Sequence, residues 1–166
     1  ELRTEIGFLF QGSALYDSMS VRENLEFPLR RHTKKFGIIE DTTPLVMEAL
    51  ESVGLAHAID LMPNELSGGM KRRIALARTL ILKPKIILYD EPTTGLDPIT
   101  SKEIVLLMNS VQKKYNTSSI IITHDVDCAK VIANRMILLI DGVNYIEGTF
   151  GELSSSTDPK VQAFFK

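Results

Sequence analysis

The chain has 166 residues, 44% of them hydrophobic and 24% charged, which is the balance of a globular domain with a sizeable core. Its net charge of −2 gives no electrostatic reason to expect nucleic acid as a partner. The single cysteine, Cys128, excludes an internal disulfide and is expected to be a small packed residue in a reducing compartment. No apolar run approaches the roughly 20 residues that a membrane-spanning helix needs.

The beginning of the sequence predicts one strand and then a helix. The apolar run at residues 6–10 predicts the strand. Ser20, with a glutamate three residues later, matches a capping box and predicts a helix over residues 21–31. Pro28 should kink or break this helix, because proline lacks the backbone N–H that a helix interior requires. The polar stretch at residues 33–41 predicts a loop.

Two more helices are expected before the next strand. Pro44 suits the first turn of a helix whose body is residues 45–53, and Gly54 should end it. A longer helix is predicted over residues 69–82, because apolar residues recur there at helical spacing. Its buried face is expected to contain Ile74, Ala77, Leu80 and Ile81.

The second half of the sequence alternates strands and helices. Residues 85–90 are too short and too apolar for a surface helix, so they predict a strand buried on both faces, as in a parallel sheet. Residues 119–123 predict a second such strand, and this alternation predicts an α/β fold. Helices are expected over residues 99–115 and 126–133, followed by a hairpin of residues 135–140 and 144–147.

Residues 66–73 combine a Ser-Gly-Gly turn with the start of a basic helix. Free backbone N–H groups and the positive end of the helix dipole meet at such a turn, so Ser67, Gly68 and Gly69 predict an anion site. An ordinary helix N-cap is the alternative, since serine is a preferred cap residue. The basic residues 71–73 are explained by attraction to phosphate or by a solvated helix face.

Charged and titratable side chains follow two of the predicted strands. Asp90 and Glu91 end the first, at the strand edge where α/β sheets expose ligands. One carboxylate can face a metal while the other acts on water. The alternative is that both are surface acids that cap the next turn. His124 follows the second strand and would face the same crevice, where it could bond a phosphate or merely cap the next helix.

The order and spacing of residues 66–70 and 86–91 resemble the signature loop and the Walker B strand of ATP-binding cassette (ABC) transporter ATPases. Such an ATPase should also carry the P-loop, Gly-x-x-x-x-Gly-Lys-[Ser/Thr], which this sequence does not contain. We therefore expect about the C-terminal two-thirds of an ABC ATPase, without its first strands and P-loop. The resemblance implies a P-loop NTPase-like core with a parallel sheet, divided into a helical subdomain (12–82), a Walker B and switch-histidine core (83–150) and a C-terminal tail (151–166).

The same resemblance implies ATP and Mg²⁺ as ligands, and roles for four residues. Asp90 would help to hold Mg²⁺ through a water molecule. Gln11 would ligate the ion through its amide oxygen and sense a membrane partner. Glu91 would orient and deprotonate the attacking water, and His124 would hydrogen-bond the γ-phosphate and the water, which makes these two residues catalytic.

A homodimer is implied as well. In ABC ATPases the signature loop, here Ser67, Gly68 and Gly69, contacts the γ-phosphate that the opposite subunit holds, so two copies pack head to tail with ATP between them. Asp97 ends a Gly-Leu-Asp sequence that resembles the D-loop, which crosses this interface. A surface turn before a helix led by Pro98 is compatible with that role.

Two details indicate a subgroup. Residues 10–24, and Met70 where most members carry glutamine, are similar to the Mla/Mkl-type ATPases, which work with a permease to move phospholipids between bacterial membranes. This implies a peripheral location on the cytoplasmic face of the inner membrane, with the permease docked after Gln11. The apolar side chains that could receive it, or form the subdomain's own core, are Leu15, Tyr16, Met19, Leu25 and Phe27.

Three alternatives remain beside the lipid-transport interpretation. A lipoprotein-release, division-linked or macrolide-type ATPase is disfavoured by residues 14–24 and Met70. A chromosome-maintenance or DNA-repair ATPase places a similar signature after a long coiled coil, and no heptad repeat occurs here. In the third alternative, the 166 residues alone lack a P-loop, bind ATP poorly and are inactive. Their sheet is then uncovered, and this is expected to make the chain self-associate.

Overall fold

The structure is a computed structural model that describes residues 2–33 and 37–165. Contacts within the chain divide it into two units, the first ending at Ile122 and the second beginning at Thr123. Residues 34–36, near the start of the loop expected at residues 33–41, lie outside the described residues.

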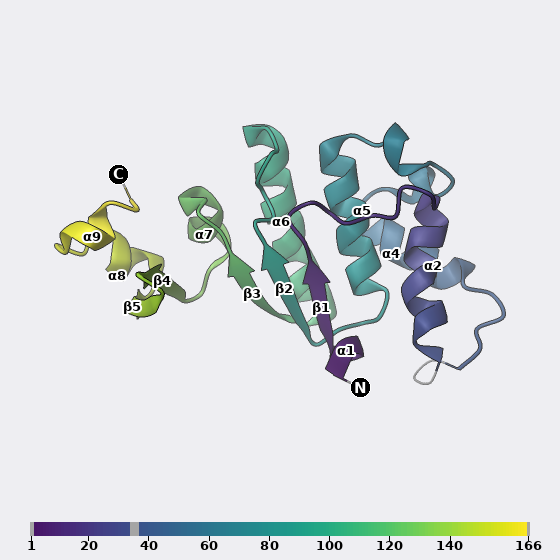
Figure 1. Cartoon of the computed structure of the whole chain (residues 1–166), viewed down its shortest axis with the longest axis horizontal. Coiled ribbons are helices and arrows are strands. Elements are labelled where there is room, and N and C mark those ends of the chain that lie inside the picture. The colour runs from purple at the N-terminus through teal and green to yellow at the C-terminus, as the bar shows by residue number, and fades with distance from the viewer. Residues whose placement is uncertain (1, 34–36, 166) are drawn as a thin grey trace. The chain divides into compact units, whose positions relative to one another are not determined.

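A parallel sheet forms the framework of the first unit (Figure 1). Its strands are β1 (Ile6–Leu9), β2 (Ile86–Asp90) and β3 (Ser118–Ile122), hydrogen-bonded in the order β1-β2-β3. The arrowheads of all three strands point the same way, so their carboxyl ends share one edge of the sheet (Figure 1). The predicted α/β fold with a parallel sheet is confirmed.

α2, α4, α5 and α6 of the first unit occupy the positions expected from the sequence to within a few residues, whereas α1 and two short 3-10 turns were not predicted. α2, α4 and α5 contact one another, and α5 also packs against β1 and α6 (Figure 1). The bounds are α1 Leu2–Glu5, α2 Val21–Arg31, α4 Thr43–Ser52, α5 Gly68–Leu80 and α6 Pro98–Tyr115, with short 3-10 turns η1 Ala56–Ala58 and η2 Pro63–Glu65.

The start of α2 confirms the predicted capping box. The Ser20 hydroxyl accepts a hydrogen bond from the Glu23 amide, and the Glu23 carboxylate accepts one from the Ser20 amide. Pro28 was expected to kink or break this helix, and the break was wrong, because α2 continues to Arg31. The neighbours of Pro28 along the buried face are core residues, and this packing outweighs the single backbone bond that the proline forgoes.

α5 lies against β1 at a point where there is no room for a side chain on the strand. The predicted buried face of α5 is confirmed for Ile74, Ala77 and Leu80. A Cβ atom on Gly7 of β1 would lie 2.4 Å from Cγ2 of Thr79, a residue of α5. Glycine is therefore required at position 7 for the helix to approach the strand so closely.

Gly7→Ala is expected to destabilise the chain by about 1–3 kcal/mol, because the added methyl overlaps the Thr79 methyl in a packed core. Thr79→Ser removes that methyl and keeps the hydroxyl beside the Phe8 and Ala75 carbonyl oxygens, so it should recover part of the loss. Urea unfolding of the two single variants and the double variant measures both effects. Equal stability of Gly7→Ala and the unchanged chain would show that the helix can move away at no cost.

One face of the sheet is only partly covered, which corrects the expectation that its strands are buried on both faces. Residues in register share a face, so Phe8, Leu88 and Ile120 form one row across the three strands. Phe8 is 42% and Ile120 60% exposed, whereas Ile87 and Tyr89, which point to the opposite face, are buried. The helices bury one face of the sheet and leave an apolar row on the other.

The second unit combines helices with a hairpin. α7 (Val126–Ile132) precedes β4 (Met136–Ile140) and β5 (Val143–Gly148), which pair antiparallel as predicted, and two short helices follow, α8 (Phe150–Ser154) and α9 (Pro159–Gln162). Cys128 is buried on α7, in agreement with the predicted packing role. The core of this unit consists of Leu138, Leu153 and Val161.

Candidate functional site

The edge formed by the carboxyl ends of the three parallel strands carries several of the predicted site residues. Asp90 is the last residue of β2 and lies in register with Ile122, the last residue of β3. Glu91 follows directly, and its amide donates to the Ile122 carbonyl oxygen at 2.9 Å. Gln11 lies two residues beyond the end of β1 and is exposed. The sheet therefore brings Gln11, Asp90 and Glu91 to one edge, where α/β sheets bind ligands.

Glu91 has an unusual backbone conformation. Its φ of 46° lies in the left-handed region, which residues other than glycine seldom adopt and which recurs at functional sites. The Thr94 hydroxyl donates to Oε2 of Glu91 at 3.0 Å and so orients the carboxylate. A sharp turn and a fixed carboxylate are suitable for a group that must hold a water molecule in one place.

The predicted anion-binding turn forms the N-terminus of α5. The Ser67 hydroxyl accepts a hydrogen bond from the Met70 amide at 3.2 Å, so serine is the N-cap as the alternative interpretation held. The cap does not exclude the anion site, because Gly68 and Gly69 lie in the first turn, where backbone N–H groups have no partner within the helix. A Cβ on Gly69 would lie 2.6 Å from Cγ2 of Thr100, so this turn packs closely on the start of α6.

Asp97 is the N-cap of α6. Its Oδ1 accepts hydrogen bonds from the amides of Ile99 at 3.1 Å and Thr100 at 3.0 Å. A hydrogen bond from the Thr100 side chain, followed by the bond from the Thr100 amide, lowers the pKa of Asp97, since both favour the ionised carboxylate. The side chain is exposed at the surface, so capping and a contact with a second copy are compatible.

Asp97→Asn is expected to remove part of the acid sensitivity of the fold. The folded-state pKa of Asp97 lies below its unfolded value, so its contribution to stability is present above about pH 4 and is lost as the pH falls through the folded-state pKa. The variant should therefore lose less stability between pH 6 and pH 2 than the unchanged chain, and thermal unfolding at each pH measures this difference. Asp17→Asn, at an exposed aspartate in the turn before α2, is the control, and equal pH slopes for all three chains would contradict the prediction.

His124 belongs to the second unit. The hydroxyl of Thr123 accepts a hydrogen bond from the Asp125 amide at 3.0 Å, and Asp125 in turn caps α7 through the Cys128 amide at 2.9 Å. Two local turns thus hold His124 at the start of a helix, with its side chain exposed.

One residue near this edge was missed by sequence reasoning. Arg72 was expected on a solvated face or near phosphate, but it is 4% exposed. Its guanidinium donates to the carbonyl oxygens of Phe10 and Thr94, in the segments that follow β1 and β2. Basic residues flank it on both sides in the sequence, and no local pattern distinguishes the buried one.

The donor set at the strand edge fits a magnesium ion that arrives with phosphate oxygens. Asp90 and Gln11 offer a carboxylate and an amide oxygen, the hard ligands that Mg²⁺ takes in small number while it keeps waters and phosphates. No group of three histidine, cysteine, aspartate or glutamate side chains in the described part of the chain could hold a metal alone. The site therefore suits a metal–nucleotide complex better than a free ion.

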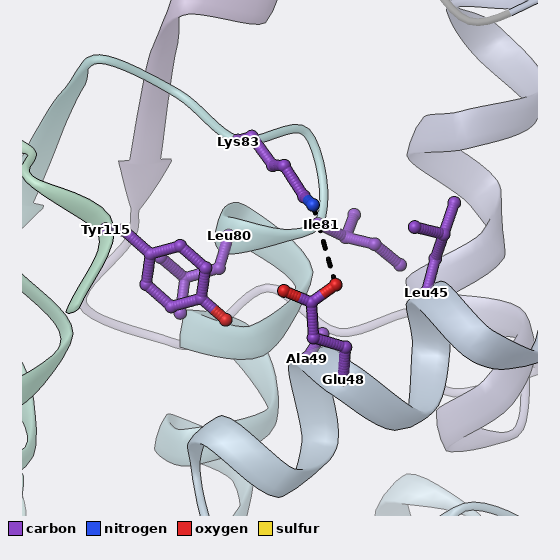
Figure 2. Close-up of a pocket in the computed structure, with 7 residues that line it drawn as sticks. All are labelled: Leu45, Glu48, Ala49, Leu80, Ile81, Lys83 and Tyr115. Carbon is purple, nitrogen blue, oxygen red and sulfur yellow. Dashed lines mark hydrogen bonds and ion pairs between the residues drawn. The ribbon is translucent and has the colours of Figure 1, made fainter.

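A small cavity elsewhere has too little room for a nucleotide. It lies between α4 and α5 and has a volume of about 10 Å³, room for at most one water molecule (Figure 2). Lys83 Nζ and Glu48 Oε2, 3.5 Å apart, form an ion pair at this cavity (Figure 2). Tyr115 lines it on another side. The open strand edge, rather than this cavity, is the candidate site.

Comparison with known sequences gives one consistent family. The family model described as "ABC transporter" matches residues 1–94. The chain is 41% identical over 167 residues to the intermembrane phospholipid transport system ATP-binding protein MlaF of Haemophilus influenzae, covering all of this chain and 62% of that protein. It is 39% identical over 164 residues to the probable ribonucleotide transport ATP-binding protein mkl of Mycobacterium leprae, covering 99% of this chain and 47% of that protein.

A solved structure is also similar. It is the dimeric structure of a post-hydrolysis state of the ATP-binding cassette MJ0796 bound to ADP and Pi, with a TM-score of 0.75 and 33% identity. The match covers 88% of this chain and 63% of that one. In the part of the chain that the structure describes, no helix is both long and apolar enough to span a membrane.

The chain thus spans between 47% and 62% of the length of these curated relatives. The family match, the likeness to MlaF and mkl, and the ABC ATPase fold agree with the resemblance carried by the signature loop and the Walker B strand. This chain belongs to the ABC transporter family, and it is similar to ATP-binding subunits of the Mla/Mkl type.

Proposed function

We propose that this chain forms part of the ATP-hydrolysing subunit of a bacterial ABC transporter that moves phospholipid between membranes. The observation that carries the proposal is the turn after β2, where Glu91 has a left-handed backbone and the Thr94 hydroxyl holds its carboxylate. A carboxylate fixed beside a metal-directed aspartate at a strand edge is the arrangement that water activation needs.

The residues of the strand edge would divide the work of hydrolysis. Asp90, through a coordinated water, and the Gln11 amide oxygen would hold Mg²⁺. The bound ion would neutralise negative charge that develops on the phosphate oxygens. Glu91 would accept a proton from the attacking water, and its fixed position would direct the water toward the γ-phosphorus. His124 belongs to the second unit, and its resemblance to the switch histidine implies that it would donate a hydrogen bond to the γ-phosphate.

Two copies of the subunit would form the complete site. The first turn of α5, with Ser67, Gly68 and Gly69, would present its free amides to the γ-phosphate bound by the other copy. Asp97, exposed at the start of α6, would cross the interface. The dimeric state of the structurally similar MJ0796 supports this arrangement. In such a dimer, residues 12–82 would act as the helical subdomain, residues 83–150 as the catalytic core and residues 151–166 as a C-terminal tail.

A groove beside the Gln11 segment supports a membrane permease as the partner. The groove has a volume of about 330 Å³, and the exposed aromatic rings of Phe10 and Tyr16 line it together with Phe27. Leu25 is fully buried, so of the apolar residues considered for docking it belongs to the subdomain's own core. A cytoplasmic helix of a permease could place apolar side chains in this groove. The subunit would then lie peripherally on the cytoplasmic face of the inner membrane.

Phospholipid is the cargo that the comparisons favour. MlaF is named as part of an intermembrane phospholipid transport system, and identity to it is 41%. The mkl relative is named for probable ribonucleotide transport and is 39% identical, which makes ribonucleotides the second candidate cargo. Transporter ATPases share their hydrolytic residues whatever they move, so the cargo must be read from the permease.

The test is to reconstitute the complete protein that contains this chain with its permease in phospholipid vesicles. ATP hydrolysis coupled to transfer of a fluorescent phospholipid between vesicles is the expected result. Hydrolysis coupled to ribonucleotide uptake would favour the second cargo. Absence of ATP hydrolysis in the complete protein would contradict the proposed function itself.

A further inference from the structure

Arg72 of α5 is a buried cation that joins two segments far apart in the sequence. Its Nη1 donates to the Phe10 carbonyl oxygen at 2.8 Å, and its Nη2 donates to the Thr94 carbonyl oxygen at 3.2 Å. Phe10 directly precedes Gln11 in the segment that leaves β1, and Thr94 lies in the turn that leaves β2. One guanidinium group therefore ties together the two segments that carry the proposed Mg²⁺ ligand and the proposed base.

The contact with Thr94 continues directly to Glu91. The Thr94 hydroxyl donates to Oε2 of Glu91 at 3.0 Å, and the Thr94 amide donates to the Glu91 carbonyl oxygen at 3.3 Å. Thr94 is thus held by Arg72 through its carbonyl and holds Glu91 through its amide and hydroxyl. A displacement of Arg72 would be passed along this chain to the carboxylate.

The burial of Arg72 is costly, which argues that its charge serves a purpose other than packing. Among the described residues, no carboxylate forms an ion pair with Arg72, and its Nε has no hydrogen-bond partner. Burial lowers the pKa of Arg72, because the charged form is removed from water. An apolar side chain of similar length would fill this space at lower cost, but it could not bond the two carbonyl oxygens.

The other arginines of α5 make different connections. Arg73 forms an ion pair with Glu103 of α6 at 2.7 Å. Arg78 donates to the carbonyl oxygens of Ser13 and Ala14, both in the segment after β1. Of the described hydrogen bonds made by the arginines of α5, those of Arg72 alone reach the segments after both strands.

We propose that Arg72 is a positioning residue for ATP hydrolysis. It holds Thr94 at a fixed position relative to the segment that carries Gln11, and through Thr94 it also holds the Glu91 carboxylate. The inference rests on the proposed ATPase function and adds a residue that acts through another and touches no reacting atom. The planar fork of the guanidinium is essential, because it reaches two carbonyl oxygens at the same time.

The test compares Arg72→Met, Thr94→Val and the double variant in the complete protein that contains this chain. Each single variant is expected to lower kcat about tenfold to a hundredfold, since a small misplacement of a catalytic group is enough for such a loss. The KM for ATP should stay within about twofold, because neither side chain is expected to touch the nucleotide. The double variant should be no slower than the worse single variant, since both changes break one chain of contacts.

A second measurement does not depend on turnover. Hydrogen exchange in peptides that cover residues 10–14 and 93–97 should become faster in both segments together in Arg72→Met. Arg72→Lys keeps the charge but has no planar fork, so it should restore little of the lost kcat. Ile74→Val, which trims a buried side chain of the same helix, is the control for stability and should leave kcat and both exchange rates unchanged.

Each outcome decides between the two proposals. Unchanged kcat in Arg72→Met and Thr94→Val, or losses that multiply in the double variant, would overturn the role of Arg72 and leave the ATPase proposal intact. Faster exchange in one segment alone would overturn the link between the two segments. If the unchanged protein hydrolyses no ATP, both proposals fall.

Discussion

Glu91→Gln is expected to abolish ATP hydrolysis in the complete protein that contains this chain, lowering kcat about a hundredfold to ten-thousandfold while ATP still binds. The amide has nearly the shape of the carboxylate and can still accept the Thr94 hydroxyl bond, so the turn after β2 should persist. It cannot accept the proton of the attacking water at neutral pH. Phosphate release in the steady state measures the loss, and equilibrium binding of a fluorescent ATP analogue measures the retained affinity.

Glu51→Gln makes the same chemical change on the exposed surface of α4 and serves as the control, with turnover expected to be unchanged. Turnover that survives in Glu91→Gln would show that another group accepts the proton. Loss of ATP affinity together with turnover would place Glu91 in nucleotide binding or in folding of the turn, rather than in the chemical step.

The elements of this fold could be predicted wherever the signal lies in neighbouring residues. Ser20 and Glu23 form a capping box, which is a local interaction, and α2 begins where that pattern predicts. Residues 85–90 are too short and too apolar for a surface helix, and β2 is found there over Ile86–Asp90. Gly54 ends α4 with a φ of 72°, as a helix-stopping glycine should.

The features that the sequence did not show depend on contacts between distant parts of the chain. Pro28 is tolerated inside α2 because core packing supports the helix on both sides, and a single-segment pattern cannot contain this information. Arg72 lies among other basic residues, and only the positions of Phe10 and Thr94 in the fold reveal it as the buried one. The role of His124 stays a prediction, because it depends on how the second unit meets a nucleotide.

The partly covered, apolar face of the sheet is expected to make the 166-residue chain self-associate when the chain is produced by itself. Phe8, Ile120 and Ile122 are 42%, 60% and 62% exposed, and Phe8 stacks on Phe10 with ring centroids 4.3 Å apart. β3 also has an unpaired edge within the described sheet. An apolar row beside an open strand edge favours pairing with a second copy of the chain. Sedimentation velocity between about 1 µM and 1 mM should show a weight-average mass that rises with concentration.

Ile120→Lys places a charge in the middle of the apolar row and is expected to shift the chain toward monomer, because the lysine would have to be buried in the contact. Leu106→Lys makes a similar change at an exposed apolar residue of α6, away from the sheet, and should leave the association unchanged. A monomer at every concentration, or equal effects of the two variants, would contradict association through this face. Asp90 lies two residues beyond Leu88 on the same face of the sheet, in register with Ile122, so a copy bound there would also obstruct the candidate site. Self-association should therefore weaken nucleotide binding by the isolated chain, and Ile120→Lys should relieve that part of the loss.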